Sequence, residues 1–205
     1  MKHMAAAVLT IAFLLSGCGG GGGGGDGAPD VGNNDGGAAT PPASISGLTG
    51  SYYDGYFNDD LSFFASNAPV FTRVDQTLDF QDSDESWQLG AVPPLQDLQT
   101  FSVMWTGRLV VPQTGTYTLY LNSDDASYLF LDGATQNLSS QSATVSNGDL
   151  HSVTEQSAEV QLSAGEHPIT IVYGENTGNH VIEFSWSSAS LNLPKQIVTA
   201  LNTTP

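Results

Sequence analysis

The chain has 205 residues, of which 21 are Asp or Glu and only four are Lys or Arg, so its formal net charge at pH 7 is −17. Nucleic acids and anionic lipid surfaces are bound through clusters of Lys and Arg, so this balance argues against both as partners. Charged residues make up 12% of the sequence, against roughly a quarter in an average globular domain. Small polar residues and glycine take their place, which indicates an extracellular β-protein.

Residues 1–17 have the pattern of a lipoprotein signal peptide. An apolar run of 11 residues, 5–15, ends at Leu15, which is also the first residue of the sequence LSGC at 15–18. The run is too short to span a bilayer as a helix, which needs roughly 20 residues. The LSGC sequence resembles the lipobox of bacterial lipoproteins, which implies that Cys18 carries lipid and anchors the chain to a membrane. Gly19 after it implies the outer membrane, with the domain in the cell envelope and outside the cytoplasm. The alternative is an ordinary secretory signal with an incidental cysteine.

Residues 18–46 are predicted to form a disordered linker that begins with the lipidated cysteine. Seven consecutive glycines, 19–25, open a stretch of Gly, Asp, Asn, Ala and Pro. Such a stretch has almost no apolar surface to offset the entropy lost on ordering. The linker therefore separates the membrane anchor from the rest of the chain.

Residues 47–190 are predicted to form one antiparallel β-domain. Large apolar residues recur at every second position within 101–121, 158–162, 169–173 and 182–186, and this period is typical of half-buried strands. Turn residues separate the segments at a spacing typical of a sandwich or barrel. Residues 57–71 have weaker periodicity, so we expect loops and short strands there. Residues 191–205 are predicted to be a C-terminal tail.

Several motifs in this region resemble, in the same order, the protective-antigen-type domain. They are WTG at 105–107, PQTGTY at 112–117, SDD at 123–125 and LFLDG at 129–133. This family is a β-sandwich shared by bacterial toxins, yeast flocculins and inserts in many glycosidases. The likeness extends over residues 47–188, and it implies an all-β fold with a single antiparallel β-sandwich or barrel domain.

Asp124 and Asp125 are the candidate metal ligands. Carboxylate oxygens suit calcium, but neighbouring residues of a strand point to opposite faces, so both can converge only if the backbone bends. In flocculin-type members the pair is joined by a cis peptide, and further ligands come from the loop before the last strand. The resemblance places Glu175 at the position of a ligating Asn, with Asn176 beside it, and thus implies a calcium site. The alternative is that the two aspartates cap a turn.

The resemblance further implies a sugar that donates two vicinal hydroxyls to the calcium ion and packs against an aromatic ring. Tyr128, three residues after Asp125, and Trp87, in an acidic loop, are the candidates for this ring. For Trp87 the alternative is packing beneath the loop. Trp105 and Trp186 follow the strand pattern and are predicted to be core residues.

No motif of the sequence favours an enzyme. The chain lacks a nucleophile elbow and an H-E-x-x-H sequence, and its only cysteine is assigned to the anchor. The predicted function is therefore that of a surface-anchored, carbohydrate-binding lipoprotein for adhesion or glycan capture, with calcium as its cofactor. The alternative is a non-catalytic structural or protein-interaction module on the cell surface.

Overall fold

The computed structural model describes residues 46–82, 87–89, 95–133 and 137–205. The predicted signal peptide, Cys18 and almost all of the predicted linker lie outside these residues. Within the described ranges, no helix is long and apolar enough to cross a lipid bilayer.

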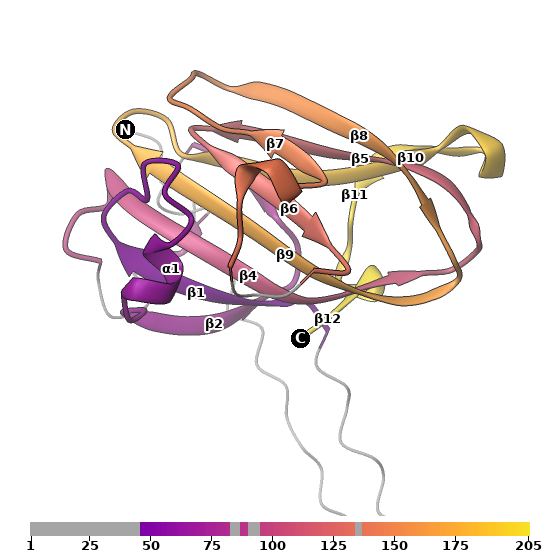
Figure 1. Cartoon of the computed structure of the whole chain (residues 1–205), viewed down its shortest axis with the longest axis horizontal. Helices are drawn as coiled ribbons and strands as arrows, with labels where there is room; N and C mark the ends of the chain where they lie inside the picture. The colour runs from indigo at the N-terminus through magenta and orange to yellow at the C-terminus, as the bar shows by residue number, and fades with distance from the viewer. Residues whose placement is uncertain (1–45, 83–86, 90–94, 134–136) are drawn as a thin grey trace, which may run out of the picture. The chain divides into compact units, whose positions relative to one another are not determined.

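The described residues form two antiparallel sheets, as the alternating sequence pattern predicted (Figure 1). The larger sheet contains, in spatial order, β2 (Phe71–Asp75), β1 (Leu48–Asp54), β4 (Thr100–Val111), β9 (Gly165–Asn176), β6 (Ser127–Leu131) and β7 (Val145–Asn147), with β12 (Thr203–Thr204) beside β4. The smaller sheet contains β11 (Leu193–Ile197), β10 (Val181–Ser188), β5 (Gly115–Asp124) and β8 (Thr154–Leu162), with β3 (Asp79–Phe80) beside β10. The helical segments are short: α1 (Phe63–Ser66), η2 (Ser140–Ser142), η3 (Ala189–Leu191) and η4 (Ala200–Asn202).

The two sheets enclose an aromatic and aliphatic core. Trp105 of β4 and Trp186 of β10 are 0% and 2% exposed, which confirms that both are core residues. Along β5 the buried positions alternate with half-buried ones through Tyr117, Leu119 and Leu121. Burial of this apolar surface, at about 25 cal/mol per Å², is the main contribution that holds the two sheets together.

A second apolar cluster covers the outer face of the larger sheet. It is built from Phe57, Phe64 of α1, Tyr128 of β6 and Val172 of β9, among others. Because β9 lies between two apolar layers, its residues from 169 to 175 are all buried, and the strand shows no alternation there. The weakly periodic segment that precedes β2 supplies most of this cover.

Residues 191–205 do not form a separate tail. β11 pairs with β10 in the smaller sheet, and β12 pairs with β4 in the larger one. The domain therefore continues beyond residue 190, because these short strands occupy hydrogen-bonding positions on both sheets.

Candidate metal site

The two candidate aspartates lie where the chain passes from one sheet to the other. β5 of the smaller sheet ends at Asp124, the peptide bond between Asp124 and Asp125 is cis, and β6 of the larger sheet begins at Ser127. Asp124 pairs with Val181 of β10. The backbone N–H of Gly174 in β9 donates to the carbonyl oxygen of Ala126, at 2.9 Å. This contact holds the acidic pair beside the end of β9.

Glu175 of β9 completes a cluster of three carboxylates. One carboxylate oxygen from each of Asp124, Asp125 and Glu175 lies within 4.8 Å of the other two. The three residues are 7%, 5% and 0% exposed. Calcium binds oxygen at 2.3–2.6 Å, so two ligand oxygens of one ion are at most about 5 Å apart. The spacing of the three carboxylates thus suits a single shared cation.

Backbone groups far away in the sequence fix the Asp125 side chain. Its Oδ1 accepts from the N–H of His151 and its Oδ2 from the N–H of Asn176, both at 3.0 Å. These donors are 26 and 51 residues away, so the side chain does not form the local cap that was the alternative interpretation. Asp125 is oriented by tertiary contacts on both of its oxygens.

Tyr173 connects the other two carboxyl-bearing residues. Its hydroxyl oxygen lies 2.6 Å from the carbonyl oxygen of Asp124 and 2.9 Å from Oε2 of Glu175. A phenol has one proton to donate, so only one of these two acceptors can receive it at a time. Oε1 of Glu175 is buried and has no hydrogen-bond partner among the described residues. A buried carboxylate oxygen without a partner is costly, so this oxygen indicates a missing ligand.

Burial and the crowding of negative charge raise the pKa values of two carboxyl groups in the cluster, those of Asp124 and Glu175. Burial raises the pKa of Asp124, and the charge of Asp125 raises it further. Burial also raises the pKa of Glu175 from 4.5 to about 8, and the charges of Asp125 and Asp124 add to this, whereas a hydrogen bond from Tyr173 opposes it. A bound cation would reverse this preference, because it stabilises the ionised carboxylates.

Three of the four predicted metal ligands therefore lie together: Asp124, Asp125 and Glu175. Asn176 is half-buried and contributes its backbone N–H to Asp125. The sequence analysis did not predict the contacts of Tyr173 with Asp124 and Glu175. They could have been expected, because residues 173 and 175 are two apart on one strand, so their side chains share a face.

The two candidate sugar-stacking rings are both buried, and the centroid of the Trp87 ring lies 5.1 Å from that of the Tyr173 ring. Trp87 is 0% exposed, stacks on Phe80 at 4.5 Å and donates from Nε1 to the carbonyl oxygen of His180. Tyr128 is 4% exposed, and its hydroxyl donates to Oδ1 of Asp59 at 2.7 Å. Neither ring offers a free face, so the prediction that they pack against a sugar is wrong. Both large side chains are more stable in apolar clusters than at the surface.

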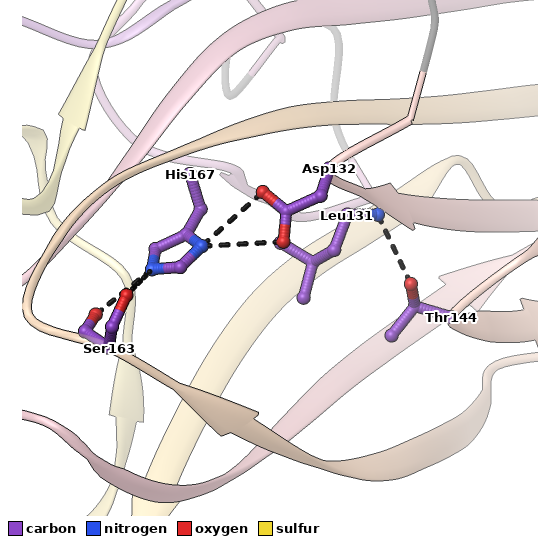
Figure 2. Close-up of polar contacts among 5 residues, drawn as sticks. All are labelled: Leu131, Asp132, Thr144, Ser163 and His167. Atoms are coloured by element: carbon purple, nitrogen blue, oxygen red, sulfur yellow. Dashed lines mark hydrogen bonds and ion pairs between the residues drawn. The ribbon is translucent and has the colours of Figure 1, made fainter.

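A serine, a histidine and an aspartate also meet away from this cluster (Figure 2). Nδ1 of His167 lies 3.3 Å from Oδ1 of Asp132, and Nε2 lies 2.9 Å from the carbonyl oxygen of Ser163 but 3.4 Å from its Oγ. In a hydrolytic triad Nε2 must accept from the serine hydroxyl. Here its nearer partner is a carbonyl, which can only accept, so the imidazole links the β8–β9 turn to the end of β6 as a structural contact.

Comparison with known proteins gives the family. Residues 44–196 match the family model described as "PA14 domain". The anti-sigma-I factor RsgI3 of Acetivibrio thermocellus is 31% identical over 146 residues, which are 71% of this chain and 19% of that protein. The structure of an anti-sigma factor domain-containing protein from Clostridium clariflavum is 28% identical with a TM-score of 0.59, over 78% of this chain and 47% of that one. The chain thus spans less than half the length of either protein.

Two further structures share the fold at lower identity. The PA14 sugar-binding domain from an RTX adhesin is 17% identical with a TM-score of 0.63, over 78% of this chain and 99% of that one. The A domain of epithelial adhesin 6 from Candida glabrata, solved in complex with Galβ1-3GlcNAc, is 12% identical with a TM-score of 0.58, over 79% and 88%. Since the family model matches well over half of the chain, from residue 44 to residue 196, and the strands form the expected two-sheet sandwich, the protein belongs to the PA14 domain family.

Proposed function

We propose that this domain binds carbohydrate through a calcium ion held by Asp124, Asp125 and Glu175. The observation that carries the proposal is the buried, unpartnered Oε1 of Glu175 within a group of three buried carboxylates. Three ionised carboxylates this close repel one another unless a cation lies between them. One divalent ion supplies that charge.

The ligand set favours calcium over other common divalent ions. Zinc prefers nitrogen and sulfur ligands, and magnesium requires oxygens at 2.0–2.1 Å in near-ideal octahedral geometry. Calcium takes six to eight oxygens at longer distances, which suits oxygens spread over as much as 4.8 Å. Three carboxylates leave coordination positions open, and two vicinal sugar hydroxyls are suitable oxygens to fill them.

Two neighbours in fold support a sugar as the ligand. One is a sugar-binding domain of an RTX adhesin, and the other is a Candida glabrata adhesin domain with a bound disaccharide. Anchoring through a lipid on Cys18 at the outer membrane belongs to the same proposal, and it rests on the LSGC sequence and on the Gly19 that follows it. Such an anchor would hold the domain at the cell surface for adhesion or glycan capture.

The proposal is tested by replacing both aspartates with asparagine, as Asp124→Asn with Asp125→Asn. The change removes two charges with little change in shape. Asparagine can accept only one of the two N–H bonds that Asp125 receives, so the melting temperature should fall somewhat. The fold should persist, while calcium heat in isothermal titration disappears. Calcium should raise the melting temperature of the wild type, because an ion at a hundredfold excess over Kd stabilises by about 2.7 kcal/mol. The double variant should show no such rise.

A matched control removes the same two charges from exposed positions. Asp79→Asn with Asp97→Asn suits this purpose, since both side chains are exposed and each accepts a hydrogen bond from a residue two positions away. This variant should keep calcium binding. Glycan arrays with and without EDTA complete the test, and an array signal that survives EDTA, or full glycan binding by the Asp124/Asp125 variant, contradicts the mechanism.

The burial of the three carboxylates supports a second candidate. With exposures of 7%, 5% and 0%, an ion between them would have few directions open to solvent. In that case calcium would be a structural ion in a protein-interaction module, and the likeness to parts of two longer anti-sigma factor proteins supports this candidate. Calcium heat together with an empty glycan array would favour this candidate.

A further inference from the structure

The loop between β7 and β8, residues 148–153, exposes two large apolar side chains. Leu150 is 57% exposed and Val153 is 47% exposed. The other large apolar side chains that are exposed in the described ranges are Val70 and Val74, at 40% and 38%. Single exposed apolar residues need no explanation. Two exposed apolar residues within four positions of one loop, beside the acidic cluster, do need an explanation.

The place is the edge of the acidic cluster. The N–H of His151, between the two apolar residues, donates to Oδ1 of Asp125 at 3.0 Å. The backbone of Val153 forms a hydrogen bond with Asp124. Leu150 and Val153 are thus next to backbone groups that contact the two aspartates directly. The loop that carries the apolar pair therefore borders the candidate metal site through its backbone.

Hydrogen bonds also fix the shape of this loop. The N–H of Asp149 donates to Oδ2 of Asp59 at 3.1 Å, and the side-chain amide of Asn147 donates to the carbonyl oxygen of Thr154 at 2.8 Å. The ring of His151 lies 3.2 Å from the carbonyl oxygen of Asn147. A loop held at both ends and in its middle presents its exposed side chains in a set position, which lowers the entropic cost of binding.

We propose that Leu150 and Val153 are the apolar platform for a pyranose ring whose hydroxyls are held by the cation, in place of the buried aromatic rings. This inference rests on the proposed function and names the surface that would select the sugar. A ring that gives two vicinal hydroxyls to an ion turns its C–H groups toward whatever lies beside that ion. Aliphatic side chains remove those C–H groups from water without competing for the hydroxyls.

The charge around the site limits the class of glycan. Three carboxylates with one divalent ion retain a charge of −1, and the charge of Asp82 acts on both Asp124 and Glu175. Asp149 lies in the loop itself. Acidic sugars would therefore be repelled, because like charges brought together at an interface cost binding energy. The ligand class is a neutral glycan with vicinal hydroxyls and an apolar C–H face.

The test replaces both apolar side chains, as Leu150→Ser with Val153→Ser, and measures calcium and glycan binding separately. The probes are calcium alone, by isothermal titration, and an array of neutral and sialylated glycans in calcium buffer. Calcium affinity should stay within twofold of wild type, since no side chain of the cluster is changed. Affinity for the brightest neutral glycan should fall by roughly 10- to 100-fold, the effect of losing one or two aliphatic contacts.

Val70→Ser with Val74→Ser is the matched control, because both side chains have similar exposure on or next to β2. It should leave both affinities unchanged. Unchanged glycan affinity in the Leu150/Val153 variant would overturn the platform and leave the calcium lectin intact, whereas joint loss of calcium and glycan binding would overturn a separate role for the loop. Brightest signals on sialylated glycans would overturn the neutral class. A wild type without calcium heat would instead refute the proposed function itself.

Discussion

Replacing Glu175 with glutamine should make the calcium-free protein more stable and unable to bind calcium. Burial and the neighbouring charges raise the pKa of Glu175 from 4.5 to about 8 in the folded state, whereas the unfolded chain keeps the ordinary value. Between these two pH values the folded protein retains a proton that the unfolded chain releases. The contribution of Glu175 to the stability of the calcium-free wild type should therefore be most favourable below about pH 4.5. It should fall as the pH rises and level off above about pH 8.

The interval from 4.5 to about 8 sets the size of the effect. At about 1.36 kcal/mol for each pH unit, it corresponds to a loss of about 5 kcal/mol in the free energy of unfolding. Glutamine at this position has no charge to bury, so the variant should lack this dependence on pH. Urea unfolding at a series of pH values between 5 and 8.5, in EDTA, measures both curves.

Bound calcium should favour the ionised form of Glu175, which is the opposite of the preference in the calcium-free protein. At pH 7 a group with a pKa of about 8 is about 0.9 protonated, so binding of calcium to the wild type should release about one proton from Glu175. Titration in buffers with different ionisation enthalpies measures this number. Below pH 8 the affinity for calcium should rise as the pH rises, because less work is needed to remove the proton.

Glu159→Gln is the control, since Glu159 is exposed on β8 and its replacement removes the same charge. It should keep both the pH dependence and the calcium heat of the wild type. The reasoning fails if calcium binding at pH 7 releases no proton, or if the wild type and the Glu175→Gln variant have the same dependence of stability on pH.

Three further predictions concern the rest of the molecule. With a formal net charge of −17, the calcium-free protein should melt at a higher temperature in 1 M NaCl than in 0.01 M, because the Debye length falls from about 30 Å to about 3 Å; a flat profile would contradict this. Asp75→Ala should cost about 3–5 kcal/mol in urea unfolding, because Asp75 accepts from Tyr52, Arg73 and Trp105 and its loss leaves a largely buried guanidinium unpaired; a loss below about 1 kcal/mol would contradict it. Cys18→Ala should abolish palmitate labelling and release the protein from the membrane fraction, and a wild type that is never labelled would refute the lipid anchor.

Much of the fold could be predicted because most strands have one covered and one partly exposed face. The alternation through Tyr117, Leu119 and Leu121 predicted both the strand β5 and the face of it that is buried. β9 is different, since its outer face is covered by Phe57 and Phe64, and its residues from 169 to 175 are all buried. Such cover comes from distant segments of the chain, so a period of two cannot reveal it.

The site could be predicted only in part, for a related reason. Asp124 and Asp125 are adjacent in sequence, but the third carboxylate, on Glu175, reaches them through the pairing of β6 with β9. Family resemblance supplied that third position, whereas local sequence did not. Trp87 and Tyr128 were misplaced because an aromatic residue near acidic residues has the same local pattern at a surface and in a core. Only the tertiary structure distinguishes these cases.

The distribution of positive charge explains why the acidic site would need a partner from outside the chain. The structure describes three Lys or Arg residues, and each already forms an ion pair: Arg73 with Asp75, Arg108 with Glu166 and Lys195 with Glu155. None of these cations pairs with the carboxylates of Asp124, Asp125 or Glu175, and buried charges without a partner are strongly destabilising. Apart from the charge of His151, which acts on Asp124, neutralisation must therefore come from bound protons or from a bound cation. Because these two compete for the same oxygens, the calcium affinity of the proposed site and the pH dependence of the empty one should change together in every variant of Glu175.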